Sequence, residues 1–476
     1  MDKINLNAKK VAFFRFKKLK DKYLITNDLG NYFFLSPDLF KQYLEGRLDK
    51  KSETYKALEA KEFIGDSLDK KNLVQNYRKR STYLFLGPSL HIVVTTLRCN
   101  YNCVYCQASS RNQKEKGYDM DIKTARKVVD AIFQTPNNLI TIEFQGGEPL
   151  ANWPVVKFIV DYARKKNKKA GKNLFITLVT NLSLLTEEKY QFLIKNRVIF
   201  CTSLDGPKQL HDRNRPWSGG SSYEATTKWI KKIQAHQKRD IDLYHVSALL
   251  TVSKFSLKYP KEIVDTYRKF GFSGVFLRPL SFLGLSGTMR SRIGYSTKEF
   301  LDYWKKTMDY IIGLNLKGEE FSERGSKIML QKILTDFDPG FLDLRSPCGA
   351  GIGQMLYNYD GKVYTCDEGR MLGNDTFLIG NVHKNSYQEM VSHDTVKSLC
   401  VASLLENLPC DNCAYKPYCG VCPVLNYALY GNIFTSLPGN ERCQLYQGML
   451  DYLFEKLQNK RIAEVFENWV RPKEGN

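Results

Sequence analysis

The 476-residue chain contains no apolar run of about 18 residues or more, the length that a membrane-spanning helix needs. Its first residues also lack the apolar core of a secretory signal peptide. No internal repeat or low-complexity tract is present, and no basic run is longer than residues 78–80. These absences predict a soluble protein of the cytoplasm with no membrane partner.

Acidic residues are fewer than basic ones, with 50 Asp and Glu against 71 Lys and Arg, which gives a net charge of +21. Such a surplus is typical either of a docking surface for an acidic peptide or for nucleic acid, or of a lysine-rich solubilising surface. The absence of a long basic run or a nucleic-acid motif favours the second, so nucleic acid is not an expected partner. A hydrophobic content of 43% excludes global disorder, and the length predicts two or three domains.

The twelve cysteines are bunched rather than spread along the chain. Three lie within residues 99–106 and eight between Cys348 and Cys443, which leaves only Cys201 isolated. In a reducing cytoplasm cysteines persist as thiols, so this bunching favours metal ligation over disulfides.

The chain divides by pattern into four segments. Residues 1–82 carry three short β-like runs and two helical runs, which predict a small α+β domain; the expected elements are 11–16, 23–26, 32–35, 37–44 and 53–61. Residues 83–295 alternate strand and helix six times, and 296–345 look like an amphipathic helical bridge. Residues 346–476 mix strand and loop with cysteine and end in an expected helix over 444–460.

The alternating segment predicts a parallel sheet that closes fully or partly into a (β/α)6 barrel. Its expected strands are 90–97, 139–144, 174–180, 198–204, 244–252 and 274–280. Its expected helices are 121–133, 153–165, 187–195, 223–236 and 261–270. The fold class is therefore α/β, and the working residues should follow the carboxyl ends of the strands.

The first of these strands runs directly into Cys99, Cys103 and Cys106, in the spacing C-x3-C-x2-C. Three thiolates can ligate a four-iron cluster and leave one iron open, whereas a zinc site would need a fourth protein ligand. With Tyr105 before the last cysteine, this loop resembles the signature of the radical S-adenosylmethionine (SAM) superfamily.

Residues after the later strands extend the resemblance. Gly146-Gly147-Glu148-Pro149 is similar to the family's GGEP motif, in which glycines allow close backbone approach and the carboxylate faces the ammonium of SAM. By the same resemblance Asn181 belongs to the cofactor site, and Ser203 and Arg215 help to hold the ribose and carboxylate of SAM. Leu280 is a candidate for an adenine contact or, alternatively, part of the barrel core.

The resemblance implies the cofactors and the reaction class. A [4Fe–4S] cluster on the three cysteines binds SAM, and an electron from a donor such as flavodoxin or ferredoxin generates a 5′-deoxyadenosyl radical. That radical abstracts hydrogen from an unactivated position, while the protein orients the substrate and excludes water.

The C-terminal cysteines resemble the SPASM domain, which carries auxiliary [4Fe–4S] clusters. That resemblance implies one cluster on Cys410, Cys413, Cys419 and Cys443, and a second on Cys348, Cys366 and Cys422. The second set is one thiolate short, so either its fourth iron is open or Cys400 completes it. A pair of zinc sites is the alternative for the whole group.

Several stretches resemble the His-Xaa-Ser system radical SAM maturases; they are residues 89–99, 106–109, 346–353, 357–361 and 367–372. This resemblance implies a ribosomally made precursor peptide as substrate, which is crosslinked, given a thioether or epimerised. Residues 1–82 then resemble a winged-helix element that captures a leader peptide by strand addition, with a scaffold role as the alternative.

Two other functions remain open. Asp367 directly follows Cys366, and in the similar sulfatase-maturing enzymes an acidic residue there acts as a base; a plain turn carboxylate is the alternative. The chain could accordingly be an anaerobic sulfatase-maturing enzyme that forms formylglycine. A non-enzymatic iron–sulfur or zinc protein is the third hypothesis.

Overall fold

A small three-stranded sheet opens the chain in the computed structural model, which describes residues 6–238, 245–434 and 440–472. The antiparallel order is β1 (Arg15–Leu19), β2 (Lys22–Thr26) and β3 (Tyr32–Leu35). The first strand begins later than predicted, because the tight β1–β2 turn sets the register and pairs Leu19 with Lys22. Residue 11 instead makes an isolated bridge to Ile64.

Three helices follow this sheet. They are α1 (Pro37–Leu44), α2 (Glu53–Ala60) and α3 (Lys70–Arg80). Ser36 and Ser52 cap the first two, since each hydroxyl accepts a backbone amide in the first turn. The sequence predicted α1 and α2 but not α3. None of the residues of α3 is buried, and its sequence is strongly polar, so it has no apolar stripe that would indicate a helix.

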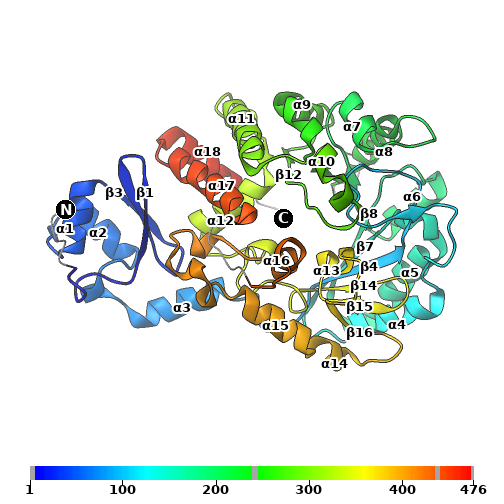
Figure 1. Cartoon of the computed structure of the whole chain (residues 1–476), viewed down its shortest axis with the longest axis horizontal. Helices are drawn as coiled ribbons and strands as arrows, with labels where there is room; N and C mark the ends of the chain where they lie inside the picture. The colour runs from blue at the N-terminus through cyan, green and yellow to red at the C-terminus, as the bar shows by residue number, and fades with distance from the viewer. Residues whose placement is uncertain (1–5, 239–244, 435–439, 473–476) are drawn as a thin grey trace.

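Six parallel strands form the centre of the molecule and confirm the predicted partial barrel (Figure 1). They are β4 (Leu90–Thr96), β7 (Leu139–Gly146), β8 (Asn173–Val179), β9 (Ile199–Ser203), β10 (Ser247–Thr251) and β12 (Leu277–Arg278). The connecting helices are α4 (Ile122–Ile132), α5 (Trp153–Ala170), α6 (Glu187–Lys195), α7 (Lys208–Asn214), α8 (Ser222–Gln237) and α9 (Pro260–Lys269). Their apolar faces bury Val, Ile and Leu against the sheet.

The sixth strand is shorter than predicted. Gly274–Val275 forms β11, which pairs with β13 (Ser322–Glu323) from the bridge instead of with the barrel. Only Leu277–Arg278 pairs with β10. This split leaves residues 279–289 free of the sheet at the mouth of the barrel.

The C-terminal region extends the barrel sheet, a pairing that the sequence did not predict. β14 (Gln354–Tyr357) lies parallel to β4 on the edge opposite β7, and β15 (Lys362–Tyr364) and β16 (Leu378–Asn381) continue it in antiparallel fashion. The nine strands thus form one sheet in the order β12-β10-β9-β8-β7-β4-β14-β15-β16. The cysteine-rich region is consequently fixed to the first barrel strand.

The bridge and the C-terminus are helical. α11 (Thr297–Asn315) and α12 (Arg324–Leu334) form the bridge. The expected last helix is two helices, α17 (Glu441–Leu457) and α18 (Lys460–Val470), because the side chain of Asn459 accepts the Ile462 amide and starts a new helix. No helix of the described residues is long and apolar enough to cross a membrane.

The N-terminal sheet is held against the C-terminal region, and Figure 1 shows α17 and α18 between that sheet and the barrel. The rings of Tyr32 and Phe34 pack on Phe454 of α17, with centroids 5.2 and 6.3 Å away. Buried Arg15 forms ion pairs with Asp28 and Asp411 at 2.8 and 3.1 Å. Polar and aromatic contacts therefore fix the two regions together.

Candidate active site

A cavity of about 210 Å³ lies at the carboxyl ends of the barrel strands and brings most of the predicted site residues together. Its walls include the three cysteines of the first loop. They also include Tyr105, Gly146, Gly147, Glu148, Asn181, Ser203 and Arg215. Among the residues predicted to contact SAM, Leu280 is the exception, because it lies beyond the end of β12 and lines a different cavity.

Each thiol of the loop has its own polar neighbour. The Sγ of Cys99 accepts the Tyr101 amide at 3.4 Å, and the Sγ of Cys106 lies 3.2 Å from Ser110 Oγ. The Sγ of Cys103 accepts a hydrogen bond from Arg215 at 3.9 Å. Burial raises the pKa of the Cys103 thiol to about 12 although the Arg215 charge opposes it.

Three thiols on one cavity wall fit the three-cysteine ligand set of an open four-iron cluster. Burial raises the pKa of the Cys99 and Cys103 thiols, so a bound cation is what would keep these two sulfurs deprotonated. Within the described residues, no three His, Cys, Asp or Glu side chains are grouped to hold a single metal ion.

Behind the loop lies a buried charge network whose centre the sequence did not predict. Asp205 is fully buried and accepts Arg215 Nε at 3.1 Å and Nη2 at 3.3 Å. The Tyr105 hydroxyl donates to the same carboxylate, and the guanidinium lies 5.2 Å from the Tyr105 ring centroid. Asp205 therefore orients Arg215, which faces Cys103. The sequence shows only that Asp205 lies ten residues before Arg215, and no local pattern indicates that the two side chains pair.

The two glycines of the GGEP motif are required by the neighbouring backbone. A Cβ at Gly146, where φ is +145°, would lie 2.2 Å from the carbonyl oxygen of Thr96. A Cβ at Gly147 would lie 2.3 Å from the carbonyl oxygen of Arg98. We expected these glycines to let backbone approach a ligand, but they first let β7 approach the start of the cysteine loop.

Glu148 is buried, and backbone and hydroxyl groups already engage its carboxylate. It accepts the Leu150 amide at 3.0 Å, Thr180 Oγ1 at 2.7 Å and the Asn181 amide at 2.8 Å. Burial raises the pKa of this carboxyl, and these hydrogen bonds oppose the rise. Glu148 thus ties the end of β7 to the end of β8 and still borders the cavity.

Asn181 connects the third strand to the cysteine loop. Its Nδ2 donates to Asn100 Oδ1 at 3.0 Å, and its Oδ1 accepts the Ser183 amide at 2.9 Å. Since Asn100 directly follows Cys99, this contact fixes where the first thiol lies.

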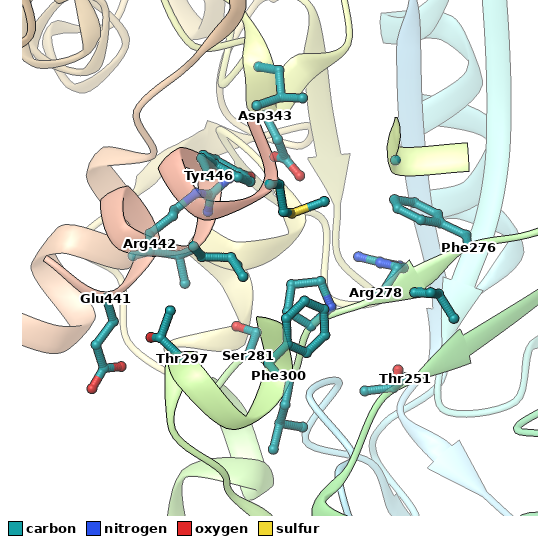
Figure 2. Close-up of a pocket in the computed structure, with 18 of the residues that line it drawn as sticks. Thr251, Phe276, Arg278, Ser281, Thr297, Phe300, Asp343, Glu441, Arg442 and Tyr446 are labelled. Atoms are coloured by element: carbon teal, nitrogen blue, oxygen red, sulfur yellow. The ribbon is translucent and has the colours of Figure 1, made fainter. Parts of the chain in front are cut away.

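A second cavity of about 210 Å³, the apolar chamber, adjoins the first (Figure 2). Gln107 and Thr251 line both cavities and form their common wall. Its remaining wall is mainly apolar and comes from residues on both sides of β12, from the bridge and from helices near the C-terminus such as α17. It includes Phe276, Leu280, Phe282, Phe300, Met329 and Met449. At the far side Figure 2 shows Asp343, Arg442 and Tyr446.

The two ligand sets that the SPASM resemblance implies remain a prediction, and the structure shows the following neighbours for their thiols. Burial first, and then the neighbouring thiols of Cys410, Cys413 and Cys443, raise the pKa of Cys419 to about 12. Cys348, Cys366 and Cys422 are buried in one apolar cluster with residues such as Phe377 and Val424. Cys400 lies on α15 (Asp394–Ser403), and the charge that acts on it is that of Arg345.

Asp367 opens a short helix, α13 (Asp367–Met371), between the second cysteine set and the barrel. Cys366 caps this helix, its Sγ accepting the Gly369 amide at 3.3 Å. Asp367 is an electrostatic neighbour of Glu143 on β7, whose carboxyl pKa is raised by burial first and by Asp367. Met371, at the C-terminal end of α13, lines the cavity that contains the three thiols, a role that the sequence did not indicate.

Comparison with known proteins agrees with this geometry. The family model described as the radical SAM superfamily matches residues 93–276. The cysteine-type anaerobic sulfatase-maturating enzyme of Clostridium perfringens is 25% identical over 382 residues, covering 78% of this chain and 97% of that enzyme. The radical SAM cyclopropyl synthase TigE of Paramaledivibacter caminithermalis is 24% identical, covering 82% and 80%. An uncharacterised protein of Synechocystis sp. is 30% identical, covering 63% and 75%.

Solved structures share the fold. Native anSMEcpe with bound AdoMet and Cp18Cys peptide superposes with a TM-score of 0.65 at 21% identity, covering 80% of this chain and all of that chain (100%). Streptococcus suis SuiB bound to the precursor peptide SuiA gives 0.53 at 15% identity, covering 89% and 97%.

The hypothesis of a non-enzymatic iron–sulfur or zinc protein is set aside by these matches, and the cofactors are those of the family, a [4Fe–4S] cluster and SAM. The cysteine-rich C-terminus fits a SPASM domain. A parallel half-barrel that ends in a three-thiol cavity, together with these relatives, identifies the chain as an enzyme of the radical SAM superfamily.

Proposed function

We propose that this enzyme is a maturase that modifies a ribosomally made precursor peptide. The observation that carries the proposal is the apolar chamber, which shares Gln107 and Thr251 with the three-thiol cavity. A residue held in the chamber would lie directly beside the site where SAM binds. Two relatives with similar folds, anSMEcpe and SuiB, are solved with peptides bound.

The size and lining of the chamber suit an apolar side chain. An apolar cavity of about 150 Å³ is large enough to bind benzene, and this chamber is larger, at about 210 Å³. Burying a Leu or Phe side chain contributes roughly 1.5–3 kcal/mol. An unactivated C–H bond on such a side chain is the kind of bond that needs a radical.

When bound, the cluster and SAM supply the 5′-deoxyadenosyl radical that abstracts hydrogen. The residues of the chain hold and shield the reactants. Arg215, fixed by Asp205, places a positive charge beside Cys103, and Glu148 places a negative charge at the cavity wall. Phe276 and Phe300 exclude water from the chamber.

Three further parts belong to this proposal. Residues 1–82 capture the leader segment of the peptide, with the outer edges of β1 and β3 as the candidate positions for an added strand. A flavodoxin or ferredoxin supplies electrons. The reaction takes place in the cytoplasm, where reducing conditions keep the thiols free.

The test is to co-express the enzyme with any short precursor-like peptide that is encoded beside its gene and to measure the mass of that peptide. We expect a mass change in the peptide together with 5′-deoxyadenosine formation by the reconstituted enzyme. Replacing Cys99, Cys103 and Cys106 by Ala should abolish both. Turnover by that triple variant, or an unchanged peptide beside active SAM cleavage, would contradict the proposal.

Sulfatase maturation is a second candidate, favoured by Asp367 directly after Cys366 at the edge of the barrel. In that case the enzyme should oxidise the Cys or Ser of a sulfatase-derived peptide to formylglycine. Asp367→Asn should then lose product formation while it retains 5′-deoxyadenosine formation. Product from the sulfatase peptide and none from the neighbouring precursor would decide for this function.

A further inference from the structure

The cysteine set of Cys348, Cys366 and Cys422 lacks a fourth thiolate within its apolar cluster. Cys400 lies on α15 among partly buried apolar residues, outside the cluster that contains these three thiols. Two carboxylates, Asp343 and Glu368, lie beside the set and also line the apolar chamber.

Backbone packing brings Asp343 to this set. It lies in a short 3-10 turn, Leu342–Leu344, that folds back on Cys348, since the Gly349 amide donates to the Leu342 carbonyl at 3.5 Å. The same turn presses on the loop before Cys422. A Cβ at Gly420 would lie only 2.6 Å from the carbonyl oxygen of Asp343.

The Asp343 carboxylate is free to act as a ligand. No hydrogen bond or ion pair joins it to another described residue. Its charge acts on the thiols of both Cys348 and Cys422, and Figure 2 shows it at the wall of the chamber with Arg442 and Tyr446 nearby. The charge of Glu368 acts on all three thiols, but its carboxyl group already shares a hydrogen bond with Asp367.

We propose that Asp343 supplies the fourth ligand of the auxiliary cluster held by Cys348, Cys366 and Cys422. This inference rests on the auxiliary cluster that the SPASM resemblance implies. Carboxylate oxygen is an accepted though weaker ligand for iron than thiolate. A cluster completed in this way has no open iron, so the target peptide binds in the chamber through its side chain and not through a bond to the metal.

The test uses the full-length chain with Cys99, Cys103 and Cys106 replaced by Ala, so that only the auxiliary sites can hold iron. After anaerobic reconstitution we expect about eight irons per chain. Mild oxidation then distinguishes two kinds of cluster. A cluster with four protein ligands keeps its four irons and gives no electron paramagnetic resonance signal. A cluster with a weakly held iron loses that iron and becomes a paramagnetic three-iron cluster.

Asp343→Asn keeps the size of the side chain and removes its charge, so folding should be retained. We expect this variant to give the three-iron signal and to fall to about seven irons, while the parent does not. Asp343→Cys restores a strong ligand and should behave as the parent. Glu441→Gln is the matched control, because Glu441 is another chamber carboxylate, exposed and paired with Arg290.

Several outcomes would overturn the inference. The first is a three-iron signal from the parent itself. The second is that signal from Glu368→Gln or Cys400→Ala but not from Asp343→Asn. The third is an iron content of the parent that does not fall when Cys348 is replaced by Ala. None of these readouts depends on peptide modification, so the proposed function and this inference can fail separately.

Discussion

Arg370 donates a hydrogen bond from Nη2 to the carbonyl oxygen of Ala108 at 3.0 Å. Arg370 lies on α13, which Cys366 caps, and Ala108 lies two residues after Cys106. One buried side chain thus joins the second C-terminal cysteine set to the loop that carries the three-thiol site.

This contact predicts that Arg370→Ala loosens the cysteine loop. A hydrogen bond from a buried charged group contributes about 1.5–3 kcal/mol. We expect only part of this energy to affect the SAM site, so SAM should bind roughly tenfold more weakly. Equilibrium dialysis of the reconstituted enzyme measures this. Arg461→Ala, which removes an exposed arginine on α18, should bind SAM as the parent does. Equal affinity in all three proteins would show that the contact has no influence on the site.

The Asp205–Arg215 pair predicts a large stability effect. Asp205→Asn leaves the Arg215 guanidinium buried without its partner, which costs about 3–5 kcal/mol in comparable cases. We expect a lower midpoint in urea unfolding of the variant, followed by tryptophan fluorescence. Asp394→Asn removes the exposed ion pair with Lys397 and should leave the midpoint unchanged. A midpoint for Asp205→Asn close to that of the parent would argue that water reaches Arg215.

His211 predicts a specific loss of stability in acid. Burial lowers its pKa to about 4, and the neutral ring accepts the Asp205 amide at Nδ1, 3.2 Å away. In the unfolded chain the pKa returns to about 6.5, so between these values only the unfolded state binds the proton. The contribution is therefore complete above pH 6.5 and falls by up to about 1.4 kcal/mol per pH unit until pH 4.

His211→Asn keeps an acceptor for the same amide but does not titrate, so its stability should decline less steeply between pH 6.5 and 4. Unfolding in urea at several pH values gives the two slopes. His393→Asn replaces an exposed helix cap and should keep the slope of the parent. His91, whose pKa is lowered to about 3 by burial, remains in each protein and leaves part of the acid loss in place. Equal slopes of stability against pH for the parent and His211→Asn would show that His211 does not cause this part of the acid loss.

The crowding at Gly147 predicts that a single methyl group disrupts the site. In Gly147→Ala the new Cβ would clash with the backbone of Arg98, which cannot move without displacing Cys99. We expect loss of SAM binding and of iron retention in the three-thiol site. Gly313→Ala adds the same methyl group in α11, where nothing lies within 4 Å, and should stabilise the helix by up to about 1 kcal/mol. Normal iron retention by Gly147→Ala would mean that β7 can shift.

The sequence allowed the barrel to be predicted because its signals are local. Each strand reads as an apolar run, the helices α4, α6 and α8 each begin at a side-chain cap, and the cysteine loop follows its strand directly. Thr186 illustrates this, since it accepts the Lys189 amide and starts α6 where the pattern begins. The three-thiol cavity could be anticipated for the same reason, because parallel strands bring their carboxyl ends to one edge.

What the sequence could not show are contacts between distant segments. β14 pairs with β4 although more than 250 residues separate them, and no local pattern records that register. Gln107 and Thr251 meet only because two loops converge at the barrel mouth. The sixth strand was predicted to reach Leu280, but β12 ends two residues earlier, a boundary that depends on β11 pairing with the bridge.

The attachment of the N-terminal sheet to α17 has a geometric consequence. Arg15, Tyr32 and Phe34 fasten that sheet to the C-terminal region, which β14 in turn fastens to the barrel. A peptide anchored on the sheet would therefore have to span a constant path to reach the chamber. The residue to be modified would therefore be selected by its distance, along the peptide, from the anchored segment.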